Sequence, residues 1–184
     1  GVSQIQKHIK DEIFLSFLPL SHVLERMAGH FYPMFINSKI YYAESMEKVA
    51  ENLSEVCPSV VVCVPRFFEK MYNGVIQKIK LGSKLKQKLF WWAIRVGKDY
   101  VAINNSSRKF PLLLKLKHSI ADKLIYSKIK QKIGKNIKFF ISGGAPLSAD
   151  VAEFFASLNI IILEGYGLTE TTPVLTSNTP DGIK

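Results

Sequence analysis

The chain has 184 residues, 47% of them hydrophobic and 22% charged, which is enough apolar material for the core of one ordinary domain. Its two cysteines, Cys57 and Cys63, lack the close Cys and His partners of a zinc site and the cysteine density of a secreted disulfide scaffold, so a reducing cytoplasm fits best. No apolar run approaches the ~18 residues that would span a bilayer, and residues 1–7 are too polar for the hydrophobic part of a secretory signal.

The formal net charge of +10 is unevenly distributed. Residues 78–138 hold 17 Lys and Arg residues against only Asp99 and Asp122, a local balance of +15, so the rest of the chain has a balance of −5. Such asymmetry is typical of proteins that bind a polyanion or attach to an anionic membrane surface. Lysine-rich solvent faces of ordinary helices give the same pattern, so all three interpretations stay open.

Five short runs of β-branched or other apolar residues alternate with longer helical patterns. Near-continuous apolarity predicts strands that are covered on both faces, and their alternation with helices predicts crossover connections and a largely parallel sheet. The fold class is therefore predicted to be α/β. The predicted strands, in chain order, are Ile13–Leu18, Lys39–Tyr42, Val60–Val64, Ile137–Ile141 and Ile160–Leu163.

Helices are predicted between these strands. Pro65 is suited to the first turn of a helix, because its missing N–H has no partner to lose there. Ser45 and Ser148 are predicted N-caps, each with an acidic residue two positions later. Two apolar sets with spacings of three and four each line one side of a helix: Phe68, Met71, Val75 and Ile79, and Leu113, Leu116, Ile120 and Leu124.

The long stretch from about 81 to 134 contains no convincing strand. It is predicted to be a helical excursion from the sheet, and the polar residues 104–107 are predicted to form the loop that divides it.

Parallel sheets bind ligands where their strands end, and two of the loops that follow predicted strands stand out. The first contains Gly143 and Gly144, whose backbone can approach a ligand closely because no Cβ stands in the way. In the second, Tyr166 can stack on a base, Thr169 can donate to a phosphate oxygen, and Glu170 can hold Mg²⁺. A tight turn without a ligand explains either loop as well.

The segment Tyr166-Gly167-Leu168-Thr169-Glu170 resembles the adenylate-site signature of the superfamily of acyl- and aryl-CoA synthetases, luciferases and peptide-synthetase adenylation domains. Residues 142–147, Ser-Gly-Gly-Ala-Pro-Leu, are similar to the loop that precedes this signature, at a matching spacing. Three further segments resemble the long-chain fatty acid branch, so the resemblance covers essentially the whole chain: Leu18–Met27, Val64–Lys70 and Leu89–Gly97.

The resemblance implies a long-chain fatty acid–CoA ligase. In that reaction a fatty carboxylate attacks the α-phosphate of ATP to give acyl-AMP and pyrophosphate, and the thiol of CoA then displaces AMP. Mg²⁺ is implied as the cofactor that neutralises the phosphate oxygens. The implied fold is part of the large N-terminal domain of an adenylate-forming enzyme.

The resemblance also implies residue roles. Tyr166 stacks on adenine, Thr169 touches the α-phosphate, and Glu170 holds the metal. His22 is expected near the reacting carboxylate, against the alternative of a structural histidine, whereas Trp91 and Trp92 are expected to pack helices rather than to gate the acyl tunnel. The implied catalytic residues are His22, Thr169 and Glu170, and the implied nucleotide-binding residues are Gly143, Gly144, Ala145, Glu164, Gly165, Tyr166, Gly167 and Thr169.

The family's phosphate-binding loop, ribose-binding aspartate and small C-terminal domain have no counterpart in this chain. Residues 1–184 are therefore expected to be a single partial domain, the central part of the N-terminal AMP-binding domain, and to be inactive alone. We expect a cytoplasmic protein that associates peripherally with membranes through residues 78–138 and binds no specific nucleic acid. The alternatives are a relative that passes its acyl group to a carrier-protein thiol, and a basic module that binds nucleic acid or a membrane surface.

Overall fold

The structure is a computed structural model that describes residues 12–104 and 110–179. These residues form two compact units. The first unit contains the described residues up to 65 together with 131–147 and 161–179, and the second contains the described residues of 66–130 together with 148–160.

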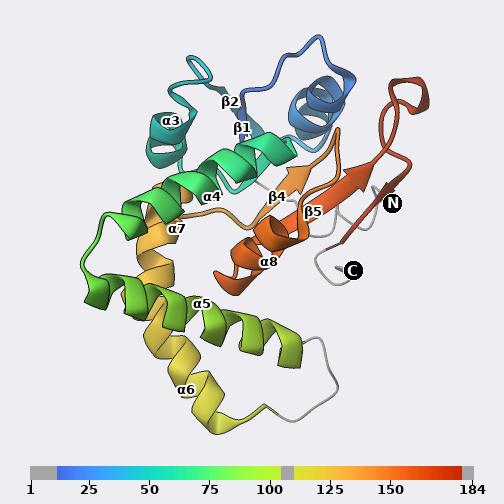
Figure 1. The fold of residues 1–184 in the computed structure, drawn as a ribbon. Coiled ribbons are helices and arrows are strands. Elements are labelled where there is room, and N and C mark those ends of the chain that lie inside the picture. The colour runs from blue at the N-terminus through green and yellow to red at the C-terminus, as the bar shows by residue number, and fades with distance from the viewer. Residues whose placement is uncertain (1–11, 105–109, 180–184) are drawn as a thin grey trace. The chain divides into compact units, whose positions relative to one another are not determined.

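The first unit is built on a six-stranded sheet with the strand order β2-β1-β3-β4-β5-β6 (Figure 1). Strands β1 to β5 are parallel, and β6 is antiparallel to β5. The predicted α/β class is confirmed, and each of the five predicted strands is present. The strands are β1 (Ile13–Ser16), β2 (Lys39–Tyr42), β3 (Val60–Cys63), β4 (Phe139–Ser142), β5 (Ile161–Tyr166) and β6 (Thr176–Ser177).

The core of this unit follows from the apolar runs. All four residues of β3 are buried, as expected for a central strand of a parallel sheet. Phe14 pairs with Val60, Val60 pairs with Phe139, and Leu163 joins the same cluster. Burying each of these side chains contributes roughly 1.5–3 kcal/mol.

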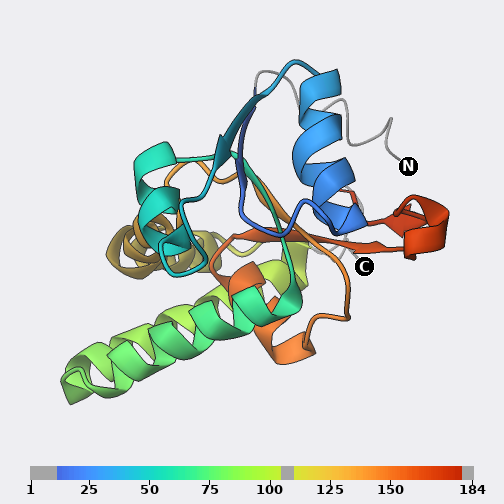
Figure 2. The same cartoon turned by 90° about the horizontal axis from the view of Figure 1, so that it is seen from above.

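The described part of the first unit before β3 contains three helices: the π-helix η1 (Glu25–Phe31), α2 (Tyr32–Phe35) and α3 (Val49–Val56). Helical residues run without interruption from Val23 to Phe35, and Figure 2 shows η1 and α2 as one blue rod. We call Val23–Phe35 the pocket helix. A π-helical segment is a frequent feature of functional sites, because its wider turn displaces side chains from the regular helical positions.

The second unit is helical. Its core includes Phe68 and Phe155, whose ring centroids lie 5.5 Å apart, and the buried Tyr126, whose hydroxyl donates to the carbonyl oxygen of Ala93 at 2.5 Å. Its helices are α4 (Pro65–Lys80), α5 (Lys84–Asn104), α6 (Leu112–Ala121), η2 (Asp122–Tyr126) and α8 (Ala149–Ser157), and α7 (Ser127–Ile133) leads back to the first unit.

The helical excursion predicted for about 81–134 is confirmed for the described residues, which contain no strand there. Pro65 begins α4, as predicted, and Ser148 occupies the predicted N-cap position of α8, although its side chain makes no capping hydrogen bond. Of the predicted dividing loop, Asn104 ends α5, and residues 105–107 lie outside the described residues.

One sequence-based expectation is wrong, and one strand lacks a sequence signal. Ser45 does not cap a helix: α3 begins at Val49, because Ser45 instead accepts the N–H of Lys48 at 3.4 Å in the preceding turn. Strand β6 was not predicted, since two residues are too short for a periodic signal.

Within the described residues, no helix combines the length and the apolar character needed to cross a membrane.

Candidate adenylate site

The loop after β5 folds back on itself. A Cβ atom at Gly167 would lie 1.4 Å from the carbonyl oxygen of Pro173, so only glycine fits this close approach of the backbone. The N–H of Leu175 donates to the carbonyl oxygen of Tyr166 at 2.9 Å and closes the loop at its base.

A short 3₁₀ turn, η3 (Thr169–Thr171), forms the tip of this loop. The hydroxyl of Thr171 accepts the N–H of Leu168 and donates to the carbonyl oxygen of Leu168, both at 2.9 Å. Thr171 therefore serves the loop itself, whereas the side chains of Thr169 and Glu170 are exposed. Tyr166 is also 62% exposed, which leaves a ring face open to a planar ligand.

The loop after β4 lies beside the first. Gly143 is buried and its N–H donates to the carbonyl oxygen of Cys63 at 3.2 Å, and Gly144 has a φ of 86°, a conformation that favours glycine. The carboxylate of Glu164 accepts the N–H of Leu147 at 3.0 Å. Glu164 thus ties the end of the glycine loop to β5.

The pocket helix forms the third side. His22 lies just before this helix, and its Nδ1 atom accepts the N–H of Leu24 at 3.3 Å, which leaves Nε2 as the protonated nitrogen of the neutral ring. Tyr32 is half-buried, and burial raises the pKa of its phenol. Its hydroxyl has no hydrogen-bond partner among the described residues.

These three segments enclose a cavity of about 500 Å³ within the first unit. The structure brings together eight of the ten predicted site residues and does not place Ala145 or Glu164 in the lining. The eight are His22, Gly143, Gly144, Gly165, Tyr166, Gly167, Thr169 and Glu170.

Much of the apolar lining comes from residues to which the sequence analysis assigned no role: Leu24, Met27, Ala28, Tyr32, Leu168 and Val174. Four of them lie on the pocket helix, where spacings of three and four put them on one side. Polar groups from the two loops therefore face an apolar wall, an arrangement typical of small-molecule sites.

Glu170 is suited to bind Mg²⁺ together with a substrate's phosphates. Its carboxylate is exposed at the cavity, and no cluster of three or more His, Cys, Asp or Glu side chains in the described part of the chain could hold a metal ion alone. Mg²⁺ commonly binds one or two carboxylates and completes its shell with water and phosphate oxygens, so a single carboxylate fits this chemistry.

Comparison with known proteins decides the family. A family model described as AMP-binding enzyme matches residues 2–184. This chain belongs to the AMP-binding enzyme family. Among curated proteins it is 32% identical over 177 residues to the peroxisomal long chain acyl-CoA synthetase 6 of Arabidopsis thaliana, covering 95% of this chain and 24% of that protein.

Two further relatives are similar over nearly the same region. FadD15 of Mycobacterium tuberculosis, a long-chain-fatty-acid–CoA ligase, is 36% identical over 166 residues, covering 89% of this chain and 26% of that protein. The human long-chain-fatty-acid–CoA ligase ACSBG2 is 34% identical over 167 residues, with coverages of 89% and 25%. The chain thus spans about a quarter of the length of these relatives.

Solved structures of AMP-binding enzymes share the fold. An A-PCP didomain of carboxylic acid reductase from Segniliparus rugosus, in complex with AMP, superposes with a TM-score of 0.61 at 23% identity, covering 91% of this chain and 19% of that one. The N-terminal domain of FACL13 from M. tuberculosis gives 0.57 at 15% identity, with coverages of 98% and 35%. The expected fold of an adenylation domain is confirmed.

Proposed function

We propose that the full-length protein is an ATP-dependent long-chain fatty acid–CoA ligase, and that residues 1–184 are the central part of its N-terminal AMP-binding domain. The observation that supports this most is the cavity at the carboxyl end of the sheet, where Tyr166, Thr169 and Glu170 face the paired glycines. The similarity to long-chain synthetases over most of the chain supports the choice of substrate.

In this proposal each residue acts on ATP or on the fatty carboxylate. Tyr166 stacks on adenine, and the hydroxyl of Thr169 donates to an α-phosphate oxygen. The backbone at Gly143 and Gly144 lies along the nucleotide without side chains in the way. His22 lies across the cavity near the fatty carboxylate, and its Nε2–H can donate a hydrogen bond that orients the attacking oxygen.

Glu170 would hold Mg²⁺, which neutralises charge on the triphosphate and the departing pyrophosphate when it is bound. We assign the first half-reaction, formation of acyl-AMP, to these groups. The groups that choose the thiol acceptor lie outside this cavity in the proposal, so a carrier protein in place of CoA remains the alternative acceptor.

The test is Glu170→Gln in the full-length protein, with Glu51→Gln, an exposed glutamate on α3, as the matched control. We expect acyl-AMP formation from ATP and palmitate to fall on the order of 10²–10³-fold, because a preorganised charge that acts in the transition state is lost. Thermal melts should not change, since the carboxylate is exposed and makes no core contact.

A synthetic acyl-adenylate supplied with CoA should still be converted by Glu170→Gln, because thiolysis needs no bridge to pyrophosphate. Equal acyl-AMP formation by wild type and variant would remove Glu170 from the site. Release of pyrophosphate by residues 1–184 alone, free of contaminating enzyme, would contradict the proposal that this chain holds only part of the site.

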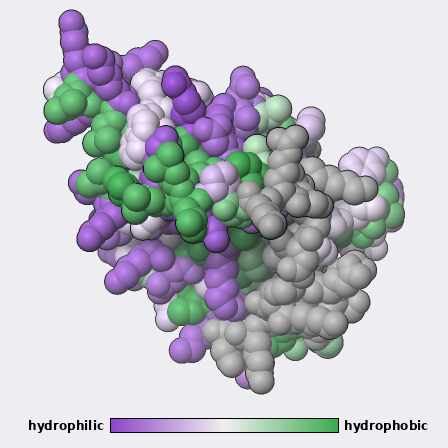
Figure 3. Space-filling model, turned by 90° about the horizontal axis from the view of Figure 1, so that it is seen from below, coloured by the Kyte–Doolittle hydropathy of each residue, from purple (hydrophilic) through white to green (hydrophobic). Residues whose placement is uncertain are grey.

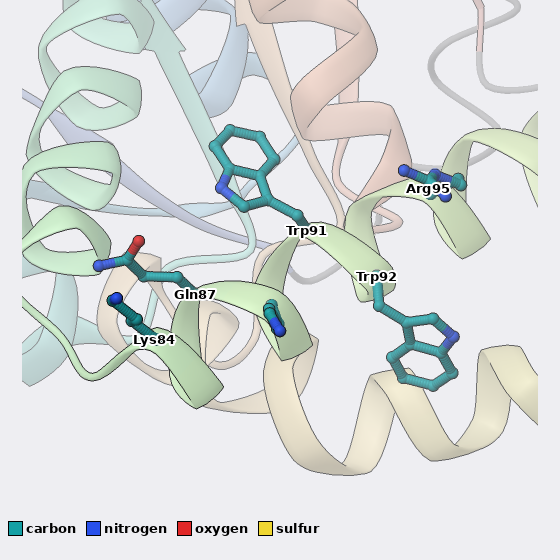
Figure 4. Close-up of a pocket in the computed structure, with 6 residues that line it drawn as sticks. Lys84, Gln87, Trp91, Trp92 and Arg95 are labelled. Atoms are coloured by element: carbon teal, nitrogen blue, oxygen red, sulfur yellow. The ribbon is translucent and has the colours of Figure 1, made fainter.

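We also propose that the full-length protein associates peripherally with anionic membranes, where long-chain fatty acids partition. Helix α5 supports this: a shallow hollow on its successive turns is lined by Lys84, Gln87, Lys88, Trp91, Trp92 and Arg95, and the two indole rings point to different sides of the helix (Figure 4). No acidic residue lies between Lys84 and Arg95. Tryptophans among cationic side chains are typical of helices at the boundary between headgroups and acyl chains.

Exposed leucines add an apolar component to the second unit. Figure 3 shows hydrophobic surface gathered between hydrophilic side chains on the side viewed from below. The predicted apolar set on α6 and η2 does share one side, but that side faces solvent rather than the core. The exposed apolar residues include Leu81, Leu85, Leu112, Leu113, Leu116, Ile120 and Leu124.

Vesicle co-sedimentation tests this association. Lys84→Gln/Lys88→Gln/Arg95→Gln should weaken binding to anionic vesicles, at about 1 kcal/mol per cation near the surface, and high salt should do the same. The control Lys39→Gln/Arg66→Gln/Lys70→Gln removes the same charge elsewhere. Equal binding by the two triple variants would mean that the basic residues of 78–138 are ordinary solvent-exposed side chains without a membrane role. Strong salt-sensitive binding to RNA instead of vesicles would favour a nucleic-acid partner.

A further inference from the structure

A carboxylic acid is buried behind the wall of the candidate site. Glu25 lies on the pocket helix and is 0% exposed. Its Oε1 atom accepts the hydroxyl of Ser16, the last residue of β1, at 2.5 Å, and the backbone of Phe17 also donates to the carboxylate. Its Oε2 atom has no hydrogen-bond partner among the described residues. A buried carboxyl with only one oxygen satisfied is costly to ionise.

The neighbours of Glu25 supply no compensating cation within the described residues. The titratable groups on the elements packed against η1 are the Cys63 thiol on β3 and the Tyr32 phenol on α2, and β1 contributes the hydroxyl of Ser16. On η1 itself, Arg26 donates to the carbonyl oxygen of Leu20, and the His30 ring is hydrogen-bonded to Tyr42.

The protonation of Glu25 follows from these surroundings. Burial raises the pKa of Glu25 to about 7, against an ordinary value of 4.5. The buried thiol of Cys63 is near enough for the charge of Glu25 to raise the pKa of that thiol further, beyond the larger effect of burial. At neutral pH the protonated and the ionised form of Glu25 are therefore both populated. The neutral acid fits an apolar environment, and the carboxylate does not.

The same helix connects Glu25 to the cavity. Leu24, Met27 and Ala28 lie one to three residues from Glu25 in sequence and line the cavity. Leu24 also contacts the glycine loop, because a Cβ atom at Gly143 would lie only 3.1 Å from both of its δ-methyl carbons. A small displacement of the helix at Glu25 therefore reaches both the apolar wall and the backbone beside the nucleotide.

Because Gly29 has no side chain, the carboxyl group of Glu25 can occupy the space beside it. A Cβ atom at Gly29 would lie 2.5 Å from the Oε1 atom of Glu25. The carboxyl thus fills the volume next to a glycine one helical turn later, in close contact with the helix backbone. This tight packing allows the carboxyl little room to move when its charge changes.

We propose that Glu25 is a positioning residue for adenylation, which holds the pocket helix against the carboxyl end of β1 and makes the shape of the cavity depend on its protonation state. The inference rests on the proposed function. In its protonated form, Glu25 keeps the pocket helix packed against β1. Ionisation places an unsatisfied carboxylate oxygen in an apolar site, and the helix shifts or admits water to solvate it, so the cavity binds its substrates less tightly.

The dependence on pH has a defined direction. The folded protein retains the Glu25 proton between pH 4.5 and about 7, where the unfolded chain has lost it. The contribution of Glu25 to stability is therefore greatest at the acidic end of this window and declines as the pH rises to about 7. Substrate binding should decline around the same pKa.

The experiment compares full-length wild type, Glu25→Gln and Ser16→Ala from about pH 5.5 to 8.5. The KM and kcat for ATP and for palmitate are measured at each pH, together with thermal melts. Gln is isosteric with the protonated acid and does not ionise. The ratio of kcat/KM between Glu25→Gln and wild type cancels the titration of ATP itself, because ATP is common to both enzymes.

We expect this ratio to rise roughly threefold to tenfold as the pH increases through 7, along the titration curve of a single proton. The change should appear in KM rather than in kcat. Ser16→Ala removes a donor to the carboxylate, so the pKa of Glu25 should increase and the inflection of this variant should move to higher pH. This shift tests the proposal even if Glu25→Gln does not fold.

A ratio that stays constant with pH, while the difference in melting temperature follows pH, would overturn the inference and make Glu25 a residue of the fold alone. An unmoved inflection in Ser16→Ala would overturn it as well. Wild type that forms no acyl-CoA at any pH would instead overturn the proposed function on which the inference rests.

Discussion

The two walls of the cavity are built on different physical principles. The loop from Tyr166 to Thr172 exposes the side chains of Tyr166, Thr169 and Glu170, and its shape comes from the approach of Gly167 to Pro173 and the hydrogen bonds of Thr171. The pocket helix instead buries a side chain, Glu25, and lines the cavity with Val23, Leu24, Met27, Ala28 and Tyr32.

The difference teaches where activity and stability separate. The exposed side chains of Tyr166, Thr169 and Glu170 can be exchanged at little cost in folding, because they are not part of the core. If Glu25 positions the pocket helix as we propose, changes behind that helix should affect both, since the packing there holds the wall. Variants of the two walls should therefore move activity and melting temperature in different proportions.

Among the variants that compare the two walls, the largest effect is expected for Gly167→Ala. The new Cβ atom would collide with the carbonyl oxygen of Pro173, so the loop must open and carry Thr169 and Glu170 out of place. Adenylation should fall about 10²-fold, the scale of a misplacement of about 1 Å. The control is Gly74→Ala on α4, where a Cβ atom meets nothing within 4 Å. Activity retained by Gly167→Ala would show that the loop tolerates another shape.

The next effect is expected for Gly29→Ala on the other wall. Its Cβ atom would press on the carboxyl of Glu25, and overpacking of this kind commonly costs about 1–3 kcal/mol of stability. Urea unfolding measures the loss. In the double variant Gly29→Ala/Glu25→Ala the two changes should partly compensate, because the added methyl fills volume that the carboxyl has left. Strict additivity would contradict the contact.

The smallest effect is expected for Tyr166→Ala, which should raise the KM for ATP about tenfold, within the ~1–3 kcal/mol that base stacking contributes at nucleic-acid sites. The melting temperature should stay the same, because the ring is mostly exposed. Tyr166→Phe keeps the ring face and should retain the wild-type KM. A raised KM in Tyr166→Phe as well would assign the binding to the hydroxyl instead of the ring.

Much of the fold could be predicted because its signals are local. Continuous apolar runs such as Val60–Cys63 occur where a strand is covered on both faces, and Pro65 marks the beginning of a helix by its own chemistry. The two loops of the cavity could be predicted for a similar reason, since paired glycines and the Tyr166–Glu170 signature are contiguous in sequence.

Other features depend on partners far away in the chain. The spacing of Leu113, Leu116 and Ile120 predicts one side of a helix but not whether that side is covered, and it is exposed. The role of Glu164 in holding the glycine loop depends on the loop's return to β5, which no local pattern specifies.

Sequence alone determined the α/β class, the order of the strands along the chain and the residues of the two candidate loops, because strand periodicity and loop chemistry are properties of neighbouring residues. Only the tertiary structure decided that Glu25 is buried. Nothing in Leu24-Glu25-Arg26 distinguishes a buried acid from a surface ion pair, and the contact with Ser16 exists only because the helix packs against the end of β1. Burial of a charged group is set by the surfaces that meet around it, and those surfaces come from separate parts of the chain.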